Sequence, residues 1–120
     1  MSNAIDFDRL VQAAGDAIIA ADPEGKILSW NPAAERIFGF AAPEALGQSL
    51  DLIIPERFRA RHWDGYKRVM RTGQTKYGAE VLRVPARHKD GRPLSIAFTV
   101  ALLARADGQT EAIAAIVRDD

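Results

Sequence analysis

The chain contains no cysteine, and this absence excludes more chemistry than any other feature of its composition. Without thiols there are no disulfide bonds, no thiolate metal sites and no cysteine nucleophile. Only two histidines are present, and their separation does not match the spacing of metal ligands. A Gly-x-Ser-x-Gly nucleophile pattern is also missing from the sequence. We therefore expect no metal site and no enzymatic activity.

Long apolar runs and an excess of charge of one sign are also lacking. The first ten residues, MSNAIDFDRL, are too polar for a secretory signal or a membrane span, so no membrane partner is expected. Sixteen basic and sixteen acidic residues cancel to a net charge of zero. The arginines between residues 57 and 71 are diluted by Glu56 and Asp64 and are expected on a solvated helix face. Direct binding of nucleic acid is therefore not expected.

What the chain does have is enough apolar sequence for one core. Its 120 residues are 48% hydrophobic, which suits a single compact domain. We expect residues 1–5 to be a tag or a disordered lead and residues 6–120 to form that domain. The chain stops just after an apolar strand, so we expect it to be one module of a longer protein.

The first half of the chain contains a helical pattern, then two short apolar runs, then the start of a second helix. Apolar residues at helical spacing predict a short amphipathic helix over residues 6–14. The apolar runs 17–22 and 26–31 flank a polar link that contains proline and glycine, which predicts a hairpin. Asn31 followed by Pro32 predicts the cap and the first residue of another helix.

The second half contains one long helix and three strands. Residues 56–72 form the long helix candidate, and the glycine that follows is expected to end it. Strands are predicted around residues 82–84, 94–102 and 111–117, the second of them with strict alternation of large and small side chains. Five strands with helices inserted between the second and third predict an α+β fold with an antiparallel sheet and helices on one face.

The outward face of the fourth predicted strand is small and uncharged. An open sheet face normally carries charged and long polar side chains, so this composition suggests that something covers it. The N-terminal helix, a second copy of the chain, or both could supply that cover; the alternative is that alanine is simply common in this chain. The residues predicted at a homodimer interface are Phe7, Leu10, Val11, Ala97, Thr99 and Ala101.

Four stretches of the sequence together resemble a PAS domain over residues 7 to 120. They are GDAIIAADPEGKILSWNPAAERIFGF, LIIPERFRARHWDGYKRVMRTG, KDGRPLSIAFTV and the final VRDD. The resemblance implies a five-stranded sheet in the order 2-1-5-4-3, with short helices and the long helix enclosing a pocket. It also implies a cytoplasmic sensory and dimerising module. Such a module regulates a downstream histidine kinase, nucleotide cyclase or DNA-binding regulator.

The resemblance also bears on cofactors. Light-sensing relatives bond flavin or coumaroyl chromophores to a cysteine, so the absence of cysteine excludes both covalent groups; non-covalent flavin is left open. Relatives that bind haem place a histidine on the long helix, and His62 in RxRHxxGY occupies the matching position. Those relatives also tend to have an arginine on the next strand. Arg83 is the candidate here, but its alternation with Leu82 and Val84 predicts that it points away from the pocket.

His62 falls on the apolar stripe of the long helix, with the basic residues on the opposite side. Three interpretations remain: a core histidine bonded to a carbonyl or a water, a polar anchor for a small organic ligand, and a haem iron ligand. The predicted ligand-binding residues are His62, Phe58, Tyr66, Val69, Phe38, Ile54, Asn31, Leu82, Ile96, Phe98 and Val100.

His88 lies beside charges and a turn in ARHKDG, so it is expected to be solvated.

A ligand-free interaction module with a filled core competes with the sensor as a class of function. A space beside His62 favours the sensor, whereas side chains that close it favour the interaction module.

Overall fold

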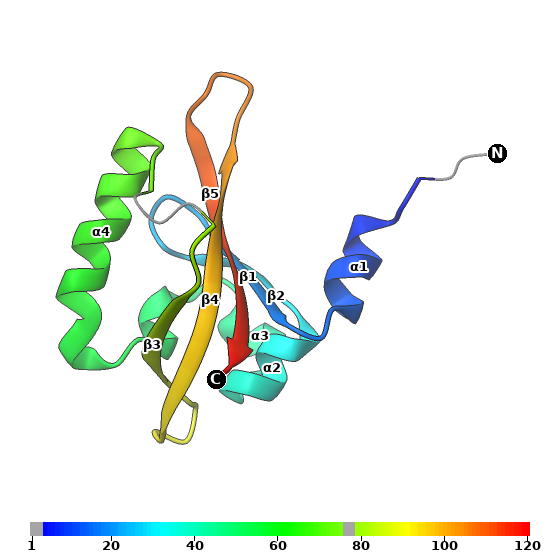
Figure 1. Ribbon diagram of the computed structural model, residues 1–120. Coiled ribbons are helices and arrows are strands. Elements are labelled where there is room, and N and C mark those ends of the chain that lie inside the picture. Colours follow the sequence, from blue (N-terminus) through cyan, green and yellow to red (C-terminus); the bar gives the residue numbers. More distant parts are fainter. Residues whose placement is uncertain (1–3, 76–78) are drawn as a thin grey trace.

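The computed structural model describes residues 4–75 and 79–120, so residues 1–3 of the predicted lead lie outside the described residues. The helical elements are α1 (Phe7–Ala13), α2 (Pro32–Phe38), α3 (Ala42–Ala45), α4 (Arg59–Thr72) and the 3₁₀ helices η1 (Leu50–Ile53) and η2 (Glu56–Phe58). The strands are β1 (Ala17–Ala21), β2 (Ile27–Trp30), β3 (Leu82–Arg87), β4 (Pro93–Ala104) and β5 (Thr110–Asp119). The order of helices and strands along the chain is the predicted one (Figure 1).

The five strands form one antiparallel sheet in the order β2-β1-β5-β4-β3. Both the predicted α+β class and the predicted strand order are confirmed. The central strands β4 and β5 form a long hairpin that extends beyond the other strands. In Figure 1, α4 stands on one side of this hairpin and α1 projects on the other.

The long helix begins differently from the prediction. Residues 56–58 form the 3₁₀ helix η2, and the α-helix α4 begins at Arg59. Pro55 precedes this turn and its carbonyl accepts the N–H of Phe58 three residues later, which is the tighter 3₁₀ pattern. The end is as expected, because Gly73 has φ +68° and donates its N–H to the carbonyl of Val69.

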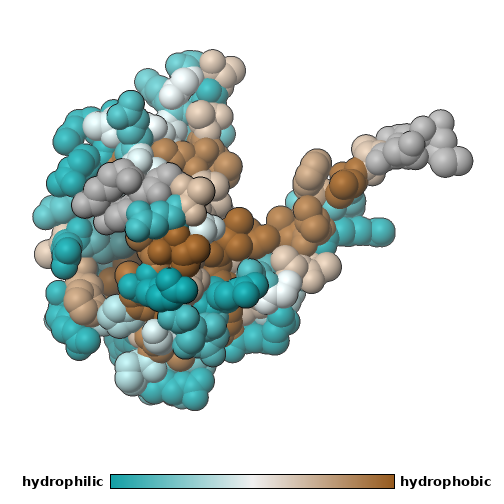
Figure 2. All heavy atoms as spheres, in the orientation of Figure 1, coloured by the Kyte–Doolittle hydropathy of each residue, from teal (hydrophilic) through white to brown (hydrophobic). Residues whose placement is uncertain are grey.

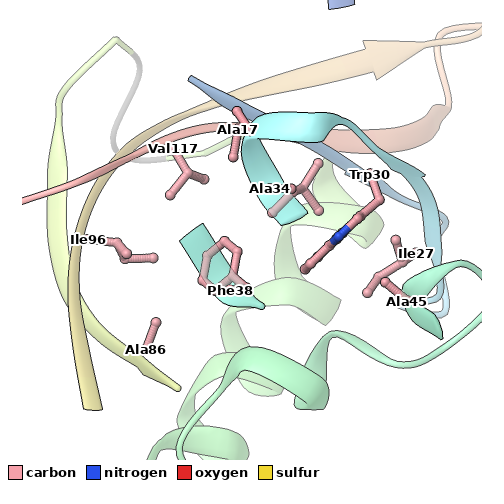
Figure 3. Packing of buried hydrophobic residues seen from close by; sticks show 11 residues of the cluster. Ala17, Ile27, Trp30, Ala34, Phe38, Ala45, Ala86, Ile96 and Val117 are labelled. Atoms are coloured by element: carbon pink, nitrogen blue, oxygen red, sulfur yellow. The ribbon is translucent and has the colours of Figure 1, made fainter. Parts of the chain in front are cut away.

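The hydrophobic core lies under α2 and α3. Phe38 at the end of α2 is fully buried and sits at the centre of the cluster, between Ile96 of β4 and Trp30 of β2 (Figure 3). The rings of Phe38 and Trp30 are 5.6 Å apart between centroids. Many of the other core residues are alanines, which let α2 and α3 approach the sheet closely. By contrast, Tyr66 is the one buried residue that α4 contributes among the described residues.

Asn31 ties four separate segments together from a fully buried position. Its Oδ1 accepts the N–H of Ala34 at 3.1 Å, which is the helix cap that the sequence predicts, and also the N–H of Ile18 at 2.9 Å. Its Nδ2 donates to the carbonyls of Val11 at 2.9 Å and Asp16 at 3.0 Å. One amide thereby joins α1, the link to β1, β1 itself and the start of α2.

Candidate functional site

Two aromatic residues of α4 attach this helix to the β1–β2 turn. The indole of Trp63 lies against the backbone of Gly25, and its Nε1 donates to Oδ1 of Asp51 at 2.7 Å. The Tyr66 hydroxyl donates to the carbonyl of Asp22 at 2.5 Å, and burial raises the pKa of the Tyr66 phenol. Trp63 thus makes an internal contact within the domain.

His62 lies beside these two rings. Its imidazole meets Trp63 edge-on at 4.6 Å and Tyr66 at 5.7 Å between ring centroids. Its Nδ1 is buried and has no hydrogen-bond partner among the described residues, a situation that costs about 1–3 kcal/mol. Burial lowers the pKa of His62, and the nearby Asp51 carboxylate opposes this effect only in part. A hydrogen bond to a backbone carbonyl, which is one form of the core-histidine interpretation, is not found at Nδ1 among the described residues.

The lowered pKa of His62 gives fold stability a pH dependence of definite sign. In the unfolded chain this imidazole titrates near 6.5, whereas in the folded protein it stays neutral to lower pH. The unfolded state therefore binds more protons in the interval between the two pKa values. We expect the His62 contribution to be complete above about pH 6.5 and to decrease as the pH falls below it.

Urea unfolding at about pH 7.5 and about pH 5.5 measures this effect, since the interval contains the unfolded-state pKa. His62→Leu is expected to reduce the difference in unfolding free energy between the two pH values. His88→Gln, at the other histidine, is the control and is expected to keep the His62 contribution. An unchanged pH dependence in His62→Leu would contradict the assignment.

The structure separates the predicted ligand-binding residues into two groups. Phe38, Ile96 and Asn31 lie in the closed core or its hydrogen-bond network, and Tyr66 is buried against the β1–β2 turn. The half-buried group is Ile54, Phe58, His62, Val69, Leu82, Phe98 and Val100. Phe98 and Val100 follow Ile96 at period two on β4, so they face the same side of the sheet as the core. The part of β4 that follows Ile96 is therefore only partly covered on this side of the sheet.

The predicted ligand-binding residues do not line either of two hollows on the surface of the described residues. The first, of about 420 Å³, lies between the end of α4, the β1–β2 turn and the β4–β5 turn, where Pro23, Met70 and Gln109 contribute to its lining. The second, of about 370 Å³, lies between η1, the start of α4 and the β3–β4 turn. Met70 could have been found from the sequence, since it follows Tyr66 by four residues and lies near the apolar stripe.

The prediction that His88 is solvated is wrong, because its side chain is only 16% exposed. The ring lies on the backbone of Gly39, where an added Cβ would stand 2.5 Å from its Cε1 atom. Nδ1 accepts the N–H of Asp90 at 3.1 Å, and the N–H of Lys89 is donated to the carbonyl of Phe38 at 2.9 Å. The contact joins the β3–β4 turn to the end of α2, which local sequence cannot show.

Charged side chains cover one end of the outer sheet face. Ala97 of β4 pairs with Arg83 on one side and Arg118 on the other, and it is only 7% exposed. Arg118 makes two contacts to Asp16, at 3.1 and 3.2 Å, and Arg83 lies 3.5 Å from Asp120. Arg83 therefore lies on the outer face, away from the core, and Ala97 offers little surface to a second copy.

The rest of the outer face is apolar and open. Thr99 pairs with Ile116, which is 43% exposed. The short helix α1 has no buried residue, and its Phe7 and Leu10 are 69% and 54% exposed. Figure 2 shows hydrophobic residues gathered in the hollow between the β4–β5 hairpin and α1. Since α1 has no buried face, it does not supply the cover predicted for the sheet within its own chain.

The strand order and the helices inserted between β2 and β3 define an α+β fold with one antiparallel sheet, and comparisons with known proteins identify the family. A family model described as the PAS fold matches residues 5–119. The chain belongs to the PAS family. A solved PAS domain from Colwellia psychrerythraea superposes with a TM-score of 0.82 at 20% identity, covering 95% of this chain and 93% of that one.

Two curated sensor proteins are similar in sequence. Sensor protein FixL of Bradyrhizobium diazoefficiens is 38% identical over 77 residues, which are 63% of this chain and 15% of that protein. The oxygen sensor protein DosP of Escherichia coli is 25% identical over 118 residues, covering 98% of this chain and 14% of that protein. The chain thus matches about a seventh of the length of each of these sensors.

Residues 4–75 and 79–120 contain no helix that is both long and apolar enough to cross a membrane. The same part of the chain holds no group of three or more histidine, aspartate or glutamate side chains placed to bind a metal ion.

Proposed function

We propose that this PAS domain senses a small, largely apolar molecule that binds between α4 and the sheet, with His62 as its polar anchor. The observation that carries the proposal is the buried Nδ1 of His62, which has no partner among the described residues. A ligand that donates a hydrogen bond to this atom would offset the cost of leaving it unpaired. No catalytic role is proposed.

The half-buried side chains on both facing elements support this location. Phe58 of η2, Val69 of α4, and Phe98 and Val100 of β4 are apolar and incompletely covered, as the walls of a ligand site are before binding. The incompletely covered side chains and the unpaired Nδ1 of His62 support a sensor over a ligand-free interaction module with a filled core.

The contacts of α4 suggest how binding is passed on. A ligand at His62 would press on Trp63 and Tyr66, whose rings hold the β1–β2 turn through Gly25 and Asp22. The turn connects directly to β1, which pairs with the last strand of the chain. We propose that ligand binding shifts the sheet between two arrangements and thereby biases an output domain.

Haem is the second candidate ligand, and the similarity to a protein named as an oxygen sensor favours it. His62 is the residue that would hold the haem iron, since its ring lies on the apolar stripe of α4 and its Nδ1 has no partner among the described residues. Arg83 would not contribute, because it lies on the outer face near Asp120. Bound haem would supply an iron centre for a diatomic gas.

Haemin titration distinguishes the two candidates. If haem binds, we expect the purified domain to shift the Soret band, His62→Ala to lose that shift and His88→Gln to keep it. If haem does not bind, native mass spectrometry is expected to find a co-purified organic molecule that is lost in His62→Ala. Absence of both signals would overturn the sensor proposal and leave the interaction module.

We further propose that the module forms a homodimer through the open apolar outer face and α1, in a cytoplasmic signalling protein. Support comes from the exposure of Phe7, Leu10 and Ile116, while Val11 is half-buried and Ala101 exposed. The output domain is proposed to be a histidine kinase, a nucleotide cyclase or a DNA-binding regulator, following the family resemblance. Analytical sedimentation tests the dimer: we expect wild type to be dimeric and Ile116→Glu to be monomeric. A monomeric wild type would refute the proposal.

A further inference from the structure

We propose that the groove between η1, the start of α4 and the β3–β4 turn is a second binding site, for a small organic molecule that carries a phosphate or a carboxylate. This site is separate from the proposed ligand position at His62. Its polar lining comes from Gln48, Ser49, Arg59, Arg87, His88 and Lys89, with Asp51 as the one acid in the lining.

The groove is rich in hydrogen-bond donors that no described residue uses. The guanidinium of Arg87 and the side-chain amide of Gln48 make no side-chain hydrogen bond or ion pair with the described residues. The Ser49 hydroxyl oxygen accepts the N–H of Asp51 at 3.1 Å, so its own proton is free to be donated. Nδ1 of His88 lies 3.1 Å from both the backbone nitrogen and Oδ1 of Asp90, so this atom is engaged within its own turn.

The acidic group in the groove is already engaged. Oδ1 of Asp51 accepts the indole N–H of Trp63 at 2.7 Å and lies 3.8 Å from Nε of Arg59. Lys89 is paired with Glu44 at 2.6 Å. Among the described residues that line the groove, Arg87 is therefore the cation without an acidic partner. A guanidinium beside free amide and hydroxyl donors suits the oxygen atoms of a phosphate or carboxylate.

The dimensions of the groove indicate that the ligand has an organic part in addition to its phosphate or carboxylate. A volume of about 370 Å³ lies at the small end of the range for organic ligands and far exceeds what one phosphate needs. The side chains of Phe40 and Leu52 form an apolar wall of the groove beside these hydrogen-bond donors. The acidic end of the ligand would face Arg87, and its body would lie against these two side chains.

Asp51 connects this groove to α4. It binds Trp63, whose ring contacts His62 at 4.6 Å between centroids. An anion that draws the guanidinium of Arg59 away from Asp51 would alter the carboxylate that holds the Trp63 indole. The second site would thereby act on the same helix face as the proposed ligand.

The test is a titration of the whole chain followed by ¹⁵N–¹H correlation spectra. The probes are inorganic phosphate, adenosine monophosphate and citrate, with sodium chloride at matched ionic strength as the blank. We expect at least one phosphate or carboxylate probe to shift the amides of residues 48, 49 and 88 and the Trp63 indole. A response to phosphate probes alone identifies a phosphorylated ligand, and a response to citrate alone identifies a carboxylate.

Arg87→Gln removes the uncompensated cation and is expected to weaken binding of the responding probe roughly tenfold. Arg61→Gln, an exposed arginine on α4 outside the groove, is the matched control and should leave the affinity within about twofold. Circular dichroism checks that both variants fold. The proposal is overturned if none of the probes binds above the salt blank, or if both variants weaken binding equally.

Discussion

Gly25→Ala is expected to destabilise the domain by about 2–4 kcal/mol, far more than an alanine in a surface turn usually costs. Gly25 has φ +82°, a backbone conformation that disfavours a side chain. An added Cβ would also stand 2.1 and 2.3 Å from two carbons of the Trp63 ring. The ring must move, and with it the contact of Trp63 with His62. Urea unfolding measures the loss of stability.

Gly91→Ala is the matched control, since Gly91 also has a positive φ, of +91°, but nothing lies within 4 Å of an added Cβ. It should show the backbone penalty alone, about 1–2 kcal/mol. A second control is Gly25→Ala combined with Trp63→Ala, which should cost less than the two single changes added together. Equal effects of Gly25→Ala and Gly91→Ala would show that Trp63 does not pack on this turn.

Asn31→Leu is expected to destabilise the domain by about 4 kcal/mol or more, and to do so without changing the net charge. The four hydrogen bonds of this buried amide would be lost together, leaving two N–H groups and two carbonyls without their partner. Such a loss is a large share of the total stability of a domain of this size. The same change should loosen α1, because Val11 is one of the four partners.

Asp6→Ala removes a comparable helix cap from an exposed position and is expected to cost about 1 kcal/mol or less. Chemical denaturation followed by circular dichroism compares the two variants. A loss below about 1 kcal/mol in Asn31→Leu would show that water replaces the amide at these groups and that Asn31 is only a helix cap.

Much of the fold could be predicted because its signals are local. The alternation over residues 94–102 gave β4, the polar link after residue 22 gave the β1–β2 hairpin, and Asn31 with Pro32 gave the start of α2. Each depends on periodicity, turn chemistry or capping within a few residues. The sheet order came from the resemblance to a family and was confirmed by the structure.

The candidate site was predicted less completely. The helical wheel correctly places Tyr66 on the inward face, and it gives no sign that the hydroxyl binds the Asp22 carbonyl or that Trp63 rests on Gly25. The prediction for His88 was wrong because its neighbours are charged while its actual contact, Gly39, lies far away in the sequence. Contacts of this kind depend on two distant segments meeting, which no local pattern encodes.

The sequence by itself determined the class of the fold, the inward side of α4 and the absence of thiol chemistry, since these follow from periodicity and residue type. Only the tertiary structure decided that Nδ1 of His62 has no hydrogen-bond partner among the described residues and that Asp51 joins Trp63 to a donor-rich groove. The physical reason is that hydrogen bonding and burial depend on which distant groups come within about 3 Å of each other. Sequence spacing alone carries no information about those distances.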